Sequence, residues 1–263
     1  DYLKEGLRLI SLEDDSRTEQ ENLTQEANIL NTLGQCYTGT TKPKKAIEYI
    51  KRAIHIRRAQ ENPIAMAENL GNLALAHKKL GDYAKAIDLM QEMTKILKEN
   101  GIKHQLGNSI MTYANLLYYI GYEDRAYKNY LEALELCKEF NSLPHIGIIY
   151  RHLGLLELNK NNAEKAIDYL LKANRMHKDS KHQIAIEMTT TFLAQAYAQN
   201  EDFENASKYI DQAVILTNRR RHNDTTNSFS EYYTLPSRCV KALIVSNIDK
   251  NNKSEIDQLF DEI

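Results

Sequence analysis

The sequence predicts an all-α protein built from stacked antiparallel pairs of helices. The 263 residues include only 4 prolines and 10 glycines, too few for the many tight turns of an all-β sandwich or barrel. Apolar residues recur at positions i, i+3, i+4 and i+7, the spacing of one face of a helix. The third observation is an unbroken period of 40 residues, seen in Ala46, Ala86, Ala126, Ala166 and Ala206.

Three further columns of small and apolar residues keep the same period. A run of repeated positions this regular indicates a repeat architecture. Seven residues after the first column come Ala53, Met93, Ala133, Ala173 and Ala213. Thirteen residues before it come Leu33, Leu73, Tyr113, Leu153 and Leu193, each followed by Gly or Ala. Between the two alanine columns lie Ile50, Met90, Tyr130, Leu170 and Ile210.

Each 40-residue unit is expected to hold two helices. In residues 69–80 the apolar positions follow helical spacing, Gly81 and Asp82 then break the run, and residues 83–97 resume it. We interpret the alanine columns as points where the two helices cross. A side chain longer than a methyl group would push the helix axes beyond their usual separation of about 8–10 Å.

Residues 30–57 and their four copies resemble the tetratricopeptide repeat. The resemblance rests on Leu followed by Gly or Ala, then an aromatic or apolar residue, a breaker and two spaced alanines, as in residues 70–96. The family's usual period is about 34 residues, so this chain carries additional helical turns in each unit. The resemblance implies a right-handed superhelical solenoid, with first helices on the concave side and second helices on the convex side.

The whole chain is expected to form one domain, because stacked repeats bury one continuous core. Residues 1–21 are interpreted as a half repeat with a linker, and residues 22–218 as five full repeats. A polar stretch without apolar periodicity, 219–233, is expected to be a loop insertion. Residues 234–263 fit the template again and are interpreted as a degenerate C-terminal repeat.

Composition excludes several classes of protein. The net charge of −2 and a pI near 6.5 give no support to a nucleic-acid binder. No apolar run approaches the roughly 18 residues that span a bilayer, so no membrane association is expected. Three cysteines without a CxxC pair predict neither a disulfide framework nor a cysteine zinc site. We therefore expect an intracellular, cytoplasmic protein.

The sequence contains no recognisable catalytic or cofactor-binding motif. There is no glycine-rich phosphate loop and no HExxH pair. His177 and His182, five residues apart, are interpreted as a solvated helix end rather than a metal site. Cys36 is expected to be a small buried hydrophobe and not a nucleophile. The sequence thus predicts a protein that is not an enzyme and needs no cofactor or metal.

Two basic clusters allow alternative interpretations. The first is favoured as a solvated convex face, with an acidic partner or nucleic acid as the alternative; it comprises Lys42, Lys44, Lys45, Lys51, Arg52, Arg57 and Arg58. The second, Arg219–Arg221 followed by His222, falls in the expected loop insertion. A solvated loop is favoured there, and a contact site is the alternative because loops often carry function. Nucleic acid is disfavoured, since no aromatic residues accompany these arginines.

Helical phase predicts which residues line the concave face. Positions two before and two after the Leu33 column point about 200° away from it: Asn31 and Gln35, Gly71 and Leu75, Met111 and Asn115, Arg151 and Leu155, Thr191 and Gln195. Amides can bond both donors and acceptors of an extended peptide. The expected binding residues are Asn31, Gln35, Asn72, Asn115, Tyr118, Tyr119, Arg151, His152 and Gln195. A clamp for acidic C-terminal tails, which some relatives carry, is incomplete here because only Asn115 and Arg151 suit it.

Three functions remain open on this basis. The favoured one is a non-catalytic scaffold whose concave groove holds a protein or peptide segment. The second is a sensor or regulatory domain of a larger signalling protein, whose effector would be a kinase, a helix-turn-helix or a caspase-like protease. The third is an architectural role in assembly or dimerisation. The amide-rich groove is similar to those of bacterial receptors for short signalling peptides, which favours the first two.

Overall fold

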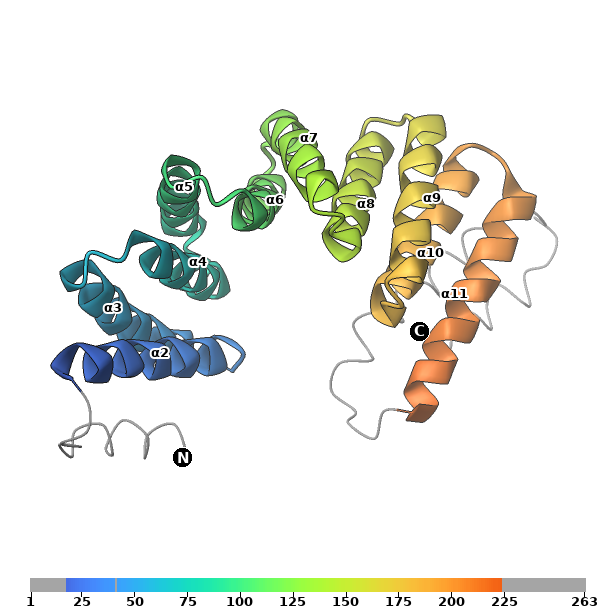
Figure 1. Ribbon diagram of the computed structural model, residues 1–263. Helices are drawn as coiled ribbons and strands as arrows, with labels where there is room; N and C mark the ends of the chain where they lie inside the picture. The colour runs from blue at the N-terminus through green and yellow to red at the C-terminus, as the bar shows by residue number, and fades with distance from the viewer. Residues whose placement is uncertain (1–17, 41, 224–263) are drawn as a thin grey trace. The chain divides into compact units, whose positions relative to one another are not determined.

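The computed structural model describes residues 18–40 and 42–223, with side chains up to Arg219. This part of the chain is helical without strands, and neighbouring helices pack in pairs (Figure 1). The all-α prediction is therefore confirmed. The helices are α2 (Glu19–Thr38), α3 (Pro43–Ala59), α4 (Pro63–Lys79), α5 (Tyr83–Glu99), α6 (Lys103–Tyr119), α7 (Glu123–Glu139), α8 (Leu143–Asn159), α9 (Ala163–Asp179), α10 (Gln183–Gln199) and α11 (Phe203–Asn223).

The chain divides into two compact units, residues 1–136 and residues 137–263, with the border inside α7. In unit 1, α2 packs on α3, α3 on α4, α4 on α5, and α5 on α6. In unit 2, α8 packs on α9, α9 on α10, and α10 on α11. A single domain over the whole chain stays a prediction. Residues 1–17 and 224–263, which include most of the expected half repeat and all of the degenerate C-terminal repeat, lie outside the described residues.

The backbone repeats every 20 residues, half the period of the sequence. From α3 to α10 every helix has 17 residues and is followed by a short turn. One residue in each turn is left-handed, at positions 61, 81, 101, 121, 141, 161, 181 and 201. The next amide closes the turn on the end of the preceding helix, as in the 3.0 Å bond from Asp82 N–H to the His77 carbonyl. This 6→1 bond is the Schellman type of helix ending.

Buried alanines mark the crossings of the paired helices, as expected from their register. All five members of the Ala46 column are fully buried. The facing column holds Gly34 and Gly154 because there is no room for a side chain. A Cβ at Gly34 would overlap Ile50, and one at Gly154 would lie 2.7 Å from Cγ of Leu170. The residues that repeat in the sequence are therefore those that set the distance between helices.

One expected boundary differs in the structure. The loop insertion was placed at 219–233, but α11 continues to Asn223, so Arg219, Arg220 and Arg221 belong to a helix. The stretch from Asn218 to Asn223 contains neither Gly nor Pro to end a helix. Cations at a helix C-terminus are also favoured by the macrodipole. Across the residues with described positions, no helix is both long and apolar enough to cross a membrane.

Candidate ligand-binding groove

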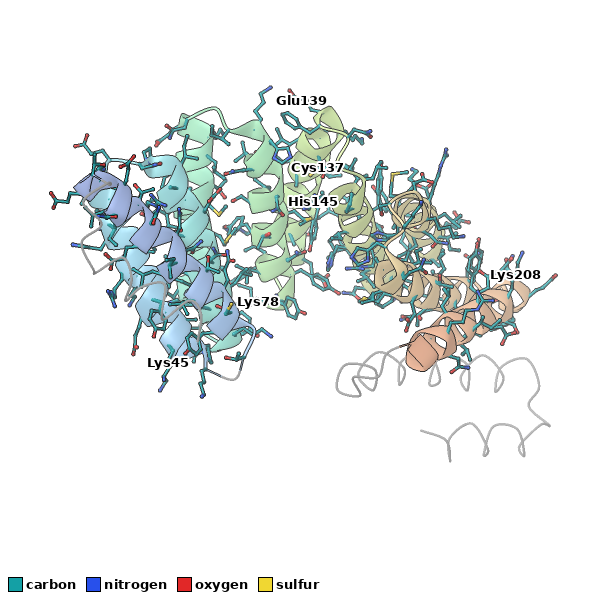
Figure 2. All side chains as sticks on the ribbon, turned by 60° about the horizontal axis from the view of Figure 1, so that its bottom comes forward. Lys45, Lys78, Cys137, Glu139, His145 and Lys208 are labelled. Carbon is teal, nitrogen blue, oxygen red and sulfur yellow. The ribbon has the colours of Figure 1, made fainter. Side chains whose placement is uncertain are left out.

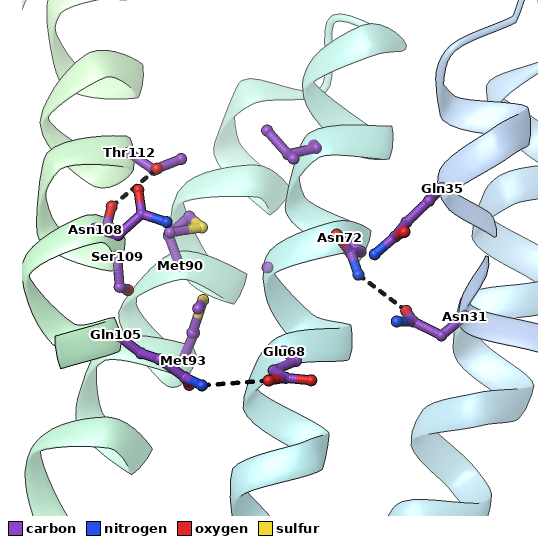
Figure 3. A pocket seen from close by; sticks show the side chains of 12 residues that line it. Asn31, Gln35, Glu68, Asn72, Met90, Met93, Gln105, Asn108, Ser109 and Thr112 are labelled. Atoms are coloured by element: carbon purple, nitrogen blue, oxygen red, sulfur yellow. Dashed lines mark hydrogen bonds between the residues drawn. The ribbon is translucent and has the colours of Figure 1, made fainter. Parts of the chain in front are cut away.

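A groove of about 450 Å³ lies over the first helices α2, α4 and α6 of unit 1 (Figure 3). Two methionines of α5 complete it. Amides and hydroxyls make up most of its polar surface, and Glu68 is the single ionisable side chain among the lining residues. The lining consists of Asn31, Gln35, Glu68, Gly71, Asn72, Leu75, Met90, Met93, Gln105, Asn108, Ser109 and Thr112.

Hydrogen bonds join the three first helices across the groove. The Asn72 amide donates to Oδ1 of Asn31 at 3.0 Å, which links α4 to α2. The Gln105 amide donates to Oε1 of Glu68 at 3.2 Å, which links α6 to α4. Figure 3 shows both bonds, one on each side of the central helix. These bonds hold polar side chains at the surface of the groove while leaving part of their bonding capacity unused.

Several polar atoms of the groove remain available to a ligand. In the described part of the chain the side-chain amides of Gln35 and Asn108 have no hydrogen-bond partner. Asn31 keeps its Nδ2 donors and Asn72 keeps its Oδ1 acceptor after their mutual bond. Donors and acceptors are therefore offered from α2, α4 and α6, so a ligand lying across all three helices could be bonded along its length.

The floor of the groove is apolar and closely packed. Gly71 allows the Met93 side chain to approach α4, because a Cβ at that position would lie 2.9 Å from the Met93 sulfur. Thr94 turns its hydroxyl to Ser109 at 2.8 Å and to the Met90 carbonyl at 2.7 Å. The bond between Thr94 and Ser109 holds the second helix α5 against α6 below the groove. Thioethers adapt to irregular apolar shapes, which suits a floor under a variable ligand.

Three of the expected binding residues line this groove. Asn31 and Gln35 were predicted from helical phase, and Asn72 as a neighbour on the same face. The structure brings all three together with Gly71 and Leu75.

The other expected residues of unit 1 lie elsewhere. Met111 is buried, and Oδ1 of Asn115 accepts a 2.6 Å bond from the Tyr130 hydroxyl in the packing column of α7. Tyr119 is exposed, with the Lys78 ammonium 4.3 Å from its ring centroid. Tyr118 is half-buried near the end of α6. A binding role for Asn115, Tyr118 and Tyr119 stays a prediction.

The remaining expected residues belong to unit 2. Arg151 and His152 are half-buried on α8, and Gln195 is exposed on α10. A guanidinium nitrogen of Arg151 lies 3.9 Å from the Met188 sulfur of α10, so this side chain reaches from one first helix toward the next. Thr191 is buried and donates to the Glu187 carbonyl. These residues also remain predictions with regard to binding.

The prediction from helical phase did not identify the residues of α6 that line the groove. Gln105, Asn108 and Thr112 line the groove, whereas the counted positions Met111 and Asn115 do not. The lining face thus moves toward the start of the helix from α2 to α6. A rule that copies the same two register positions into every repeat cannot follow this drift. The signal in the sequence was the helical spacing of the polar residues Gln105, Asn108 and Thr112, which places them on one face of α6.

Three other expectations need correction. Arg57 is buried rather than solvated, because its guanidinium donates to Gln60, to the Asn28 side chain and to the Thr24 carbonyl. Burial lowers the Arg57 pKa, and the nearby Glu68 carboxylate acts in the opposite direction. Cys36 is exposed rather than buried.

His177 is buried and not part of a solvated helix end. Its ring occupies the space that the missing side chain of Gly147 leaves in α8. Burial is the main cause that lowers the His177 pKa to about 4, with further contributions from the Arg151 charge and from His182. No group of three or more His, Cys, Asp or Glu residues is placed to hold a metal ion in the part of the chain that is described.

Comparison with known families agrees with this architecture. A family model described as the MalT-like TPR region matches residues 27–233, most of the chain. The chain belongs to the MalT-like TPR family. The tetratricopeptide resemblance read from the sequence is thereby confirmed, and the 40-residue period is the form that the repeat takes in this member.

Known relatives of this MalT-like TPR chain are larger proteins. Human SH3 domain and tetratricopeptide repeat-containing protein 2 is 25% identical over 229 residues, which cover 84% of this chain and 18% of that protein. Response regulator aspartate phosphatase A of Bacillus subtilis (strain 168) is 22% identical over 188 residues, covering 72% of this chain and 48% of that protein. The chain thus spans less than half the length of either relative.

A solved structure supports the same fold. The structure of a Rap protein complexed with competence and sporulation factor has a TM-score of 0.69 at 15% identity, covering 94% of this chain and 66% of that chain. At this level of identity the likeness establishes the fold. Together with the family match, it identifies the fold of the chain as a TPR-type solenoid of paired helices.

Proposed function

We propose that this chain is a non-catalytic scaffold that binds an extended segment of protein or peptide in the groove of unit 1. The observation that carries the proposal is the set of unused amide atoms on three successive first helices, at Gln35, at the Asn31–Asn72 pair and at Asn108. An extended peptide offers one backbone donor and one acceptor at nearly every residue. Side-chain amides supply both partners without selecting a single ligand group.

The charge of the groove restricts the ligand that we propose. Glu68 is the one ionisable lining residue, and its carboxylate is paired with the neutral Gln105 amide at 3.2 Å. An acidic ligand group would meet this carboxylate without any cation in the lining, so neutral or basic segments are favoured. The thioethers of Met90 and Met93 would accept an apolar side chain from the same segment.

A regulatory role within a larger protein is the second candidate. Its support is that the chain spans less than half of response regulator aspartate phosphatase A, one of its relatives. Another relative has been solved with competence and sporulation factor bound. In that case the peptide held by the groove would be a signal, and the parts of the protein beyond this chain would carry the response.

Peptide selection followed by substitution tests the groove. Peptides selected from a random displayed library on the wild-type chain should bind roughly ten-fold or more weakly to Gln35→Ala with Asn108→Ala, because each loses a hydrogen bond of about 1 kcal/mol or more. Affinity is measured by fluorescence anisotropy, with melting temperature as the folding check. Gln20→Ala with Gln183→Ala is the matched control, since both amides are exposed outside the groove.

Two results would contradict the groove as the binding site. One is equal affinity of the selected peptides for the wild type and for the Gln35 and Asn108 variant. The other is an equal loss in the Gln20 and Gln183 control. Glu68→Gln adds a test of the charge restriction: it should weaken basic peptides selectively and leave neutral peptides nearly unchanged.

A further inference from the structure

The helix α3 differs in charge from the other second helices of the same length. It carries six Lys or Arg residues and one acidic residue, although the whole chain has a net charge of −2. The helix α5 has three of each sign, α7 has an acidic excess, and α9 has four basic residues against three acidic. Among the second helices of 17 residues, positive charge is therefore concentrated on α3.

The exposed cations of α3 form a stripe along one face. Lys44, Lys51 and Arg58 are exposed and seven residues apart, so they lie in a row with about 10 Å between successive positions. His55 and Lys45 are exposed beside them, and Figure 2 labels Lys45 near the start of the helix. Glu48 is the one acidic residue on this face. We call Lys44, Lys51 and Arg58 the basic stripe.

Among the residues that the structure describes, no acidic side chain neutralises the basic stripe. In the described residues, Lys44, Lys51 and Arg58 have no acidic group within 4.0 Å, and Glu48 pairs with none of them. Arg52 lies beside the stripe and is different, because it pairs with Glu26 at 3.0 Å. Arg57 is buried and is bonded to neutral groups of α2 and to Gln60, which follows α3. The helix thus carries two kinds of basic residue. Arg52 and Arg57 are bonded to neighbouring side chains, whereas Lys44, Lys51 and Arg58 make no ion pair within the described residues.

The position of two lysines works against the stability of the helix. The first turn of α3 contains Lys44 and Lys45 and no acidic residue. Cations near a helix N-terminus are opposed by the macrodipole, and the first turns of α2, α7 and α9 carry the favoured acidic residues instead. Local stability therefore does not account for the lysines at the start of α3.

We propose that the basic stripe of α3 is a second interaction surface, which binds a short acidic segment of a partner protein. The helix is about 25 Å long, and an acidic residue of α2, Glu26, borders it at Arg52. The positive surface thus ends with the helix. A partner segment of similar length, with acidic residues at every second turn, matches its charges.

The neighbouring residues favour a protein segment over nucleic acid. A duplex carries a negative charge about every 1.7 Å and extends beyond one helix, where it would meet the acidic residues of α2. The aromatic residue of α3, Tyr49, is half-buried and stacked on Tyr37 with ring centroids 5.5 Å apart. It offers no open face for a base, and binding of single strands relies on such faces.

The stripe and the groove are formed by different residues. No residue of α3 lines the groove, whose side chains come from α2, α4, α5 and α6. Both surfaces could then be occupied together, as in a scaffold that joins two partners. The failure of either binding test leaves the other proposal intact.

A labelled polyglutamate peptide about as long as α3 tests the proposal on the full chain. At low ionic strength it should bind saturably, and Lys44→Glu with Lys51→Glu and Arg58→Glu should weaken binding by about ten-fold or more. The matched control on α5 makes the same change of charge at three exposed lysines, Lys85→Glu with Lys95→Glu and Lys98→Glu, and should stay within about two-fold of the wild type.

Substitution of Glu48, the acidic residue beside the stripe, gives a second test. Its expected result is stronger binding, which misfolding of α3 would not produce. Glu48→Gln should strengthen polyglutamate binding, by about two-fold, because it deletes a like charge facing the ligand. Unchanged or weaker binding by this variant overturns the proposal, as does an equal loss in the α5 control. Tighter binding of a DNA duplex than of polyglutamate, with the same dependence on the stripe, would replace the acidic segment by nucleic acid.

Discussion

Side chains at two facing register positions compensate one another in volume within unit 2. Gly147 of α8 faces His177 of α9, and a Cβ on the glycine would lie 2.5 Å from the imidazole. One repeat later the large residue is on the other helix: Glu187 of α10 accepts a 2.6 Å hydrogen bond from Thr217 of α11. The imidazole gains close packing without hydrogen bonds, since neither ring nitrogen of His177 has a partner in the described residues.

The buried imidazole predicts a loss of stability in mild acid. The His177 pKa falls from 6.5 to about 4 in the folded chain, so the unfolded chain takes up a proton first as the pH is lowered. Stability should therefore decrease between about pH 6.5 and pH 4, by roughly 3 kcal/mol for this group. The decrease should stop below that window, where both states are protonated.

Denaturant unfolding of the wild type and of His177→Leu across this pH range isolates the effect. Leucine is already present at the same register position in α5, as Leu97. The carboxylates of Asp82 and Asp202, whose pKa values are lowered by hydrogen bonds from neighbouring side chains and backbone amides, contribute equally to both proteins. The free energy of unfolding of the wild type, relative to that of His177→Leu, should fall by roughly 3 kcal/mol as the pH is lowered from about 6.5 to 4. Parallel curves would show that His177 is not the group responsible.

At the scale of elements, the turns between helices are more regular than the sequence. The left-handed position is glycine in three turns and asparagine in two, but it is Glu61, Lys181 and Glu201 in the other three. Left-handed conformations cost an ordinary residue about 1–2 kcal/mol. The end of one helix and the start of the next are fixed together by the Schellman bond, which holds these residues in place.

Glycine at a left-handed position should therefore stabilise the chain. Glu201→Gly relieves the strain of a φ of 60°, and after the entropy cost of glycine we expect a gain of up to about 1 kcal/mol. The same substitution at Glu132, an exposed residue inside α7, should instead cost about 1 kcal/mol. Thermal and denaturant unfolding of both variants measure the two shifts. A loss of stability in Glu201→Gly would mean that the glutamate makes contacts that outweigh its strain.

The sequence revealed the paired helices because residues at helix crossings have little freedom. Ala166 and Gly154 are constrained by close backbones, so they repeat and can be found by spacing alone. The regular turns, which recur every 20 residues, could not be predicted from the sequence. Residue types such as Glu201 and Lys181 have no preference for a left-handed conformation. In the groove, Asn31 and Gln35 followed from helical phase, but Glu68 and Gln105 did not. Their position depends on how each helix rotates relative to the one before, which no single register column records.

At the scale of the whole molecule, stability should be local because each repeat packs on its neighbours. In unit 2, Ala166 lies in a buried cluster with Leu158, Leu170 and Leu193, drawn from three consecutive helices. Unit 1 has its own buried residues, among them Ala27, Leu30 and Ala53 of α2 and α3. Damage to one cluster can therefore be compared with an undamaged cluster in the same chain.

Ala166→Leu tests this locality. The added volume should overpack the crossing of α8 and α9 and cost roughly 1–3 kcal/mol. Hydrogen exchange should show the loss of protection in α8, α9 and α10, while α2 and α3 keep the protection of the wild type. Ala84→Leu is the control, because Ala84 is exposed on α5 and should change neither quantity. A uniform loss of protection from α2 to α11 would instead show that the chain unfolds as one cooperative unit, and unchanged melting would refute the role of the alanine column as the crossing point.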